Sequence, residues 1–86
     1  MVTREVLIEW VLEAIIARGG SGHVADVARA IWERHEGELR AGGDLFYTWQ
    51  YDMRWAAQQL RNAGKLKDVK GRRGLPWELA DKSHAS

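Results

Sequence analysis

The chain of 86 residues has no cysteine, a single proline and no long apolar segment. Without cysteine it can form neither a disulfide scaffold nor a thiolate zinc site, and it has no cysteine nucleophile. Its uninterrupted apolar runs are too short to span a bilayer. Glu5 places an acid where a signal peptide would be basic and then apolar. These absences predict a soluble cytoplasmic protein that does not contact a membrane.

A net charge is almost lacking as well, because 13 Lys and Arg offset 12 Asp and Glu to give +1. The charges are nevertheless unevenly distributed. Residues 1–51 carry 5 basic and 8 acidic side chains, a net of −3, whereas residues 52–86 carry 8 and 4, a net of +4. Such asymmetry indicates an anionic partner for the C-terminal part, with a solvated mixed surface as the alternative.

Apolar residues recur at helical spacing in three segments. The first predicted helix follows Thr3, a good N-cap, and ends at the glycine-rich segment 19–22. The second covers residues 27–35 and extends toward Leu39, with glycine at 37 as a break. The third begins between residues 44 and 48 and ends near 63. Hydrophobic residues make up 45% of the chain, which is enough for one core of modest stability.

The C-terminal region predicts a β-hairpin. Its strands are residues 65–70 and 75–79, and Gly71–Gly74 forms the turn. A minimal strand at His23–Val24 would precede the second helix. Helix, short strand, helix, long helix and hairpin is the order of a winged helix-turn-helix, a mainly α fold with a small β-hairpin. We therefore expect one such domain over residues 1–80, followed by a flexible polar tail at 81–86.

The end of the third helix and the predicted wing also carry a recurring set of residues in a fixed order. An apolar residue, a Trp-Ala pair and a leucine precede an Ala-Gly-x-Leu helix exit and a wing with Arg-Gly and Trp-x-Leu. Here they are Met53, Trp55-Ala56, Leu60, Ala63-Gly64-Lys65-Leu66, Arg73-Gly74 and Trp77-Glu78-Leu79. Residues 53–79 thereby resemble the winged-helix domain of Mrr-type restriction proteins. The resemblance implies a DNA-binding module, often appended to a nuclease domain that attacks foreign or modified DNA.

The side of the third helix opposite its core is rich in groups that bind nucleic acids. Tyr47, Tyr51, Arg54 and Gln58 stand at i, i+4, i+7 and i+11, and Arg61 extends the row. In the major groove Arg can pair with guanine and Gln with adenine, while Tyr can bind phosphate or pack on a base. A merely solvated helix surface is the alternative interpretation.

The predicted wing contributes clustered cations suited to phosphate or the minor groove. They are Lys67, Lys70, Arg72 and Arg73. Trp55 has two interpretations: it packs beneath the hairpin or against Trp77, or it offers an aromatic surface to a base. Together these residues predict a non-enzymatic module for double-stranded DNA, with the third helix in the major groove. In the cell it would associate with the nucleoid.

Residues suited to catalysis or metal binding are sparse, and we expect neither an enzyme nor a cofactor. Asp68-Val69-Lys70 matches half of a metal-dependent nuclease site, but such a site needs a second acid to hold Mg²⁺ and is normally built on the central sheet of a larger fold. His23, His35 and His84 have no zinc-binding spacing. Two alternative functions remain, a small transcriptional regulator and a protein-docking or dimerisation module. Docking of a basic partner would use an acidic patch consisting of Glu5, Glu9, Glu13, Glu33, Glu36 and Glu38.

Overall fold

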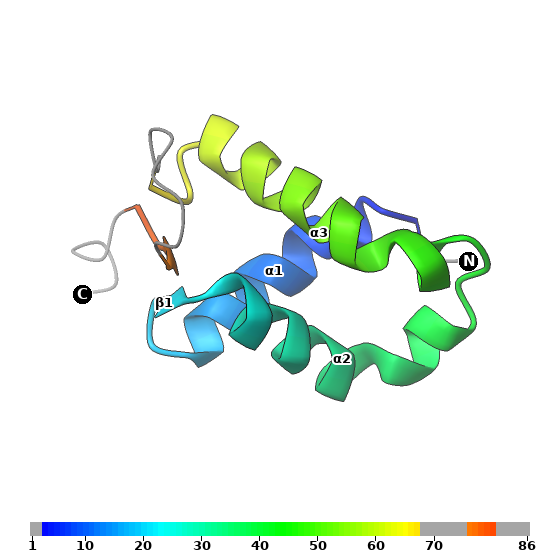
Figure 1. The fold of residues 1–86 in the computed structure, drawn as a ribbon. Coiled ribbons are helices and arrows are strands. Elements are labelled where there is room, and N and C mark those ends of the chain that lie inside the picture. The colour runs from blue at the N-terminus through cyan, green and yellow to red at the C-terminus, as the bar shows by residue number, and fades with distance from the viewer. Residues whose placement is uncertain (1–2, 68–75, 81–86) are drawn as a thin grey trace.

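Residues 3–67 and 76–80, which a computed structural model describes, form three helices and one small antiparallel sheet (Figure 1). The elements are α1 (Val6–Ala17), β1 (Ser21–Gly22), α2 (Val24–Arg40), α3 (Leu45–Asn62) and β2 (Trp77–Glu78). The predicted mainly helical class with a little strand is confirmed. The predicted turn at 71–74 and tail at 81–86 lie outside the described residues.

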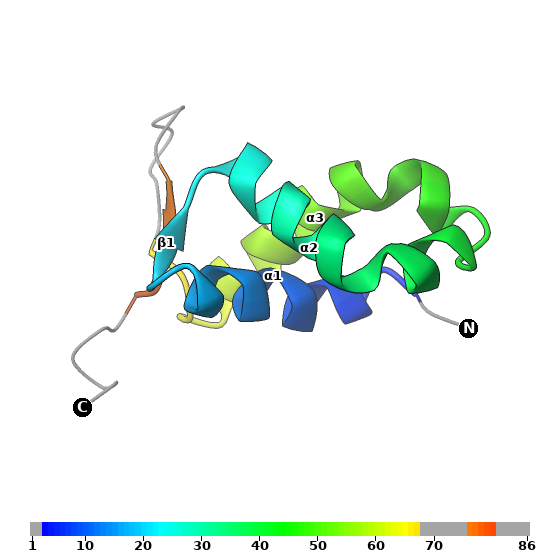
Figure 2. The ribbon, with the colours of Figure 1, turned by 90° about the horizontal axis from the view of Figure 1, so that it is seen from below.

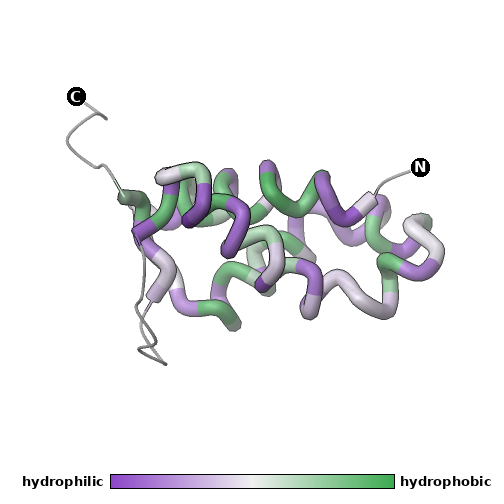
Figure 3. Tube along the Cα trace, turned by 90° about the horizontal axis from the view of Figure 1, so that it is seen from above, coloured by the Kyte–Doolittle hydropathy of each residue, from purple (hydrophilic) through white to green (hydrophobic). Residues whose placement is uncertain are grey.

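The core lies where α1 packs against α3 and α2. Hydrophobic and hydrophilic residues alternate along each helix (Figure 3), so that each helix turns one apolar side inward. The largest fully buried side chains come from α1 and α2: Leu7, Val11, Ile15, Val27, Ile31 and Leu39. From α3 the core receives Met53, Ala56, Ala57 and Leu60. The remaining side of α3 is thereby free to face outward.

The sheet lies at the end of the molecule away from the N-terminus (Figure 2). Ser21 pairs with Glu78 and Gly22 with Trp77. On the other edge of β2, Leu79 bridges to Leu66, and the Lys67 N–H donates to the Glu78 carbonyl at 2.9 Å. Between the two predicted hairpin strands the described residues thus form one isolated bridge, and the two-stranded sheet of β2 is with β1.

The minimal strand is displaced from its predicted position at His23–Val24. His23 instead precedes α2 as its N-cap, with an extended backbone, and its carbonyl accepts the N–H of Val27 at 2.9 Å. Because Val24 already belongs to the helix, pairing with β2 falls to residues 21–22. Gly20, with φ of 107°, makes the turn that leads into this strand.

The second helix passes through Gly37 and continues to Arg40, so that the expected extension toward Leu39 is confirmed and the expected break at Gly37 is wrong. It bends at His35, whose φ of −126° and ψ of 22° are not helical. Leu39 beyond the bend is fully buried, and its burial favours continuation of the helix over a break.

The sequence also places Trp10, Trp32, Trp49 and Trp77 in the core, and Trp10, Trp49 and Trp77 are indeed buried. Trp32 is only half-buried and packs against the edge of the core. It stacks on Trp49 with ring centroids 6.1 Å apart and lines an open hollow between α2 and α3. None of the described helices is long and apolar enough to cross a membrane.

Candidate functional site

The outward side of α3 carries an exposed row of four side chains, Tyr47, Tyr51, Arg54 and Gln58. Spacings of four, three and four residues place them along one side of the helix. Tyr47 is 83% and Tyr51 78% exposed. Large side chains in such positions gain little from burial, so their contribution to folding is small. The structure therefore brings these four sequence-predicted residues together on one surface.

At its C-terminal end the exposed row is fixed by hydrogen bonds. Gln58 Nε2 donates to Asn62 Oδ1 at 3.0 Å, and Arg61 Nη1 donates to Gln58 Oε1 at 3.2 Å. The guanidinium of half-buried Arg61 also lies 5.9 Å from the ring centre of Trp77. Arg61 thus joins the α3 surface to β2. The bonds of Gln58 to Arg61 and Asn62 follow from spacings of three and four residues, which bring side chains together on a helix.

Trp55 lies outside the exposed row. Its side chain is half-buried against the core, and the guanidinium of Arg4 covers the ring at 4.1 Å from its centre. Arg4 thus occupies the aromatic surface that was expected for a base, whereas packing beneath the hairpin or against Trp77 stays a prediction. Arg4 lies before α1, outside residues 53–79, which carry the resemblance to winged helices. That resemblance therefore did not predict its contact with Trp55.

The cations of the described residues fall into two groups. Arg4, Arg18, Arg34 and Arg40 each form an ion pair with an acid. Five other cations form none within residues 3–67 and 76–80: Arg29, Arg54, Arg61, Lys65 and Lys67. Four of these five lie on α3 or in the segment directly after it. Within the described residues, no ion pair therefore neutralises the positive charge of α3 and of the segment after it. Such charge attracts an anionic partner.

Acids on the outer side of α1 and α2 are mostly engaged within the chain. Glu13 accepts from His35 Nε2 at 3.0 Å and lies 3.4 Å from Arg34, while Glu38 accepts from His35 Nδ1 at 2.8 Å. The His35 hydrogen bond, with His35 and Arg34 charges, lowers the pKa of Glu13 below its ordinary value. The predicted acidic patch is thus partly neutralised, because Glu9 and Glu33 alone among its six members lack an ion pair in the described residues.

His35 also stacks on Trp10, with ring centroids 3.8 Å apart and planes 5° from parallel. Its two ring nitrogens both face carboxylates, Nε2 that of Glu13 and Nδ1 that of Glu38. The cluster of Trp10, Glu13, His35 and Glu38 links α1 to the bend of α2. The contact of His35 with Glu13 could not be predicted from local spacing, because 22 residues separate the two.

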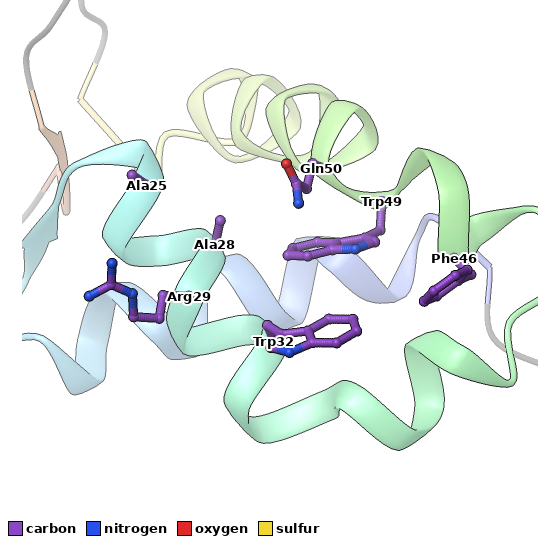
Figure 4. A pocket seen from close by; sticks show the side chains of 7 residues that line it. All are labelled: Ala25, Ala28, Arg29, Trp32, Phe46, Trp49 and Gln50. Carbon is purple, nitrogen blue, oxygen red and sulfur yellow. The ribbon is translucent and has the colours of Figure 1, made fainter.

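Two adjoining hollows lie between α2 and α3. The larger, of about 580 Å³, is lined by the rings of Trp32, Trp49 and Phe46 (Figure 4). The second, of about 410 Å³, continues toward Tyr51 and Arg54. Ala25 and Ala28 line both, and Arg29 lies at the end of the larger hollow away from Phe46 (Figure 4). Among the residues that the structure describes, no acid lines either hollow.

Several predicted positions fall outside the described residues: Lys70, Arg72 and Arg73, with Asp68-Val69-Lys70 and His84. Their roles stay predictions. Lys67 is exposed at the base of the hairpin, beside β2. Within the part of the chain that is described, no group of three His, Asp or Glu could hold a metal ion.

No protein-family model, no curated protein and no solved structure matches this chain. The functional argument accordingly depends on the surfaces just described.

Proposed function

We propose that the protein is a non-enzymatic winged helix-turn-helix that binds double-stranded DNA, with the exposed row of α3 in the major groove. One observation carries this proposal. Exposed tyrosines share one side of α3 with a cation that no acid of residues 3–67 or 76–80 neutralises. Arg54 is that cation, between Tyr51 and Gln58 along the row. A duplex supplies both of the missing partners, namely phosphates and base edges.

The fold is compatible with this placement. Helices of a helix-turn-helix present the recognition helix outward while its opposite side packs in the core. α3 is buried along one side through Met53, Ala57 and Leu60 and is exposed along the other. The bridge between Leu66 and Leu79 would form the base of the wing, on which Lys67 is exposed.

Each contact has a definite chemistry in this proposal. Arg54 donates to guanine O6 and N7, and Gln58 pairs with adenine after exchanging its bond to Arg61. Tyr47 and Tyr51 donate to phosphate or pack on a thymine methyl. Lys67 adds a phosphate contact, and the wing cations Arg72 and Arg73 would extend it. Trp55 is left out of the interface, because Arg4 already covers its ring.

The resemblance to Mrr-type restriction proteins extends this proposal to modified DNA. Apolar contact of Tyr51 with a 5-methyl group on cytosine would favour methylated over unmodified duplex. Docking of a basic protein on the acidic patch is a weaker alternative, because His35 and three arginines already pair with most of that patch.

The test is binding of fluorescent duplexes, measured by anisotropy at several salt concentrations. We expect the logarithm of affinity to fall linearly with the logarithm of salt, by about 0.9 per phosphate neutralised. Arg54→Ala should cost about 1–3 kcal/mol on a preferred site and much less on random duplex. Replacing both Arg72 and Arg73 by Ala should weaken binding to all duplexes alike.

Arg34→Ala is the matched control, because it also removes one positive charge but from a cation paired with Glu13. It should leave duplex affinity nearly unchanged. Equal losses for Arg54→Ala and Arg34→Ala would mean that net charge and not the α3 row binds DNA. Absence of any salt-dependent binding by the folded wild type would contradict the proposal.

A further inference from the structure

Two apolar features take no part in the proposed DNA contact. One is the larger hollow between α2 and α3, with Trp32, Trp49 and Phe46 along it. The other is Ile16 of α1, whose side chain is 57% exposed although it is fully aliphatic. Both features are apolar surfaces that one copy leaves exposed to solvent, and contact between them would remove both from water.

The charges around the two features are complementary as well. Arg29 lines the larger hollow and Arg54 the adjoining one, and neither forms an ion pair in the described residues. On α1, Glu9 stands two helical turns before Ile16 on the same side of the helix and also lacks an ion pair there. Glu9 beside Ile16 is thus opposite in charge to Arg29 beside the larger hollow.

One copy cannot make this contact with itself. In Figure 4 the ribbon of α1 passes behind the hollow, and the buried side of α1 faces α2 and α3. Ile16 and Glu9 are on the opposite, exposed side of α1 and point away from the hollow. The knob that fills the hollow must therefore come from another molecule.

We propose that the hollow between α2 and α3 of one copy receives Ile16 of a second copy, with Glu9 of that copy paired to Arg29. Because knob and hollow lie on opposite sides of each molecule, the contact is heterologous and joins chains head to tail. It goes beyond DNA binding and can be measured without DNA. Copies bound side by side along a duplex would gain from it.

The test is sedimentation velocity of the full chain without DNA, from about 10 µM to about 1 mM, the range suited to a small transient interface. The weight-average mass of the wild type should rise from that of a monomer to at least twice that value. Glu9→Arg, Arg29→Glu and Ile16→Ser should each remain monomeric throughout. His23→Ser, which changes an exposed side chain that lines neither hollow, is the matched control and should associate like the wild type.

Mixing Glu9→Arg with Arg29→Glu gives the decisive result. The first variant keeps an intact hollow and the second an intact α1, so an equimolar mixture should associate although neither variant does alone. All substituted side chains are exposed, and circular dichroism checks that each variant is folded. A wild type that stays monomeric at the highest concentration, or a mixture that does not associate, would overturn the proposal. DNA affinity plays no part in either outcome.

Discussion

The outer side of α1 and α2 and the outer side of α3 have comparable numbers of polar side chains but use them differently. On the first, Glu13, Glu38 and Arg34 are joined to His35 or to one another. On the second, Arg54 has no acid partner in the described residues, and Tyr51 is 78% exposed. Polar groups that satisfy one another stabilise the fold, whereas those left to solvent remain available for binding.

The difference predicts that substitutions on the two surfaces affect different properties. Changes around His35 should lower the free energy of unfolding and leave duplex binding intact. Changes in the α3 row should do the reverse. Substitutions that affected both properties equally would break the comparison.

The largest expected effect is that of Trp10→Ala. Trp10 is 6% exposed and supports the His35 ring, so its truncation should cost about 3–5 kcal/mol of unfolding free energy, as for other large-to-small core changes. Tyr51→Ala on the other surface should change stability by about 0.5 kcal/mol or less. Urea unfolding followed by circular dichroism measures both. Similar midpoints for the two variants would contradict the assignment of Trp10 to the core.

His35→Ala should have the next largest effect. It removes the stack on Trp10 and hydrogen bonds to Glu13 and Glu38, which together should lower stability by about 1–2 kcal/mol. His23→Ala is the matched control, since His23 is exposed and makes no side-chain cap bond. A destabilisation as large for His23→Ala would show that the cluster contributes nothing specific.

Local patterns predicted most of the helical structure, and long-range contacts account for the errors. Helical periodicity and the glycine at 64 correctly placed α3 to within a residue or two. Gly37 was an unreliable break, because burial of Leu39 outweighs the modest cost of a glycine inside a helix. The strand pairing of β2 with Ser21–Gly22 could not be read locally, since more than fifty residues separate them.

In the candidate site, too, local spacing predicted some features and long-range contacts could not be predicted. Spacing alone predicted that Tyr47, Tyr51, Arg54 and Gln58 share one side of α3. It could not predict that Arg4 covers Trp55, because the two residues lie 51 positions apart in the sequence. Ion pairs such as Arg34 with Glu13 were equally inaccessible, and with them the partial neutralisation of the acidic patch.

Gln58→Ala should sharpen the comparison on the α3 surface. A neutral amide contributes less to base recognition than a guanidinium, so the loss on a preferred duplex should be about 0.5–1.5 kcal/mol, below that of Arg54→Ala. Its stability should hardly change, because its partners Asn62 and Arg61 remain at the surface. Anisotropy with the same two duplexes at one salt concentration provides the measurement. A larger loss than for Arg54→Ala would reverse the assigned roles.

The smallest expected effect is the pH dependence that Glu13 gives to stability. Its pKa in the folded chain is lowered from an ordinary 4.5, chiefly by the hydrogen bond from His35. The stabilisation is therefore fully present above that ordinary pKa and is lost as the pH falls through the lowered folded value. Because the Glu13 side chain is 49% exposed, solvent screening limits the contribution to about 1 kcal/mol or less.

Urea midpoints measured from pH 6 down to about pH 3 should fall less steeply for Glu13→Gln than for the wild type. Glu9→Gln, which alters an acid without an ion pair in the described residues, should retain the wild-type slope. Equal slopes for Glu13→Gln and the wild type would show that the His35 bond does not favour the charged form of Glu13.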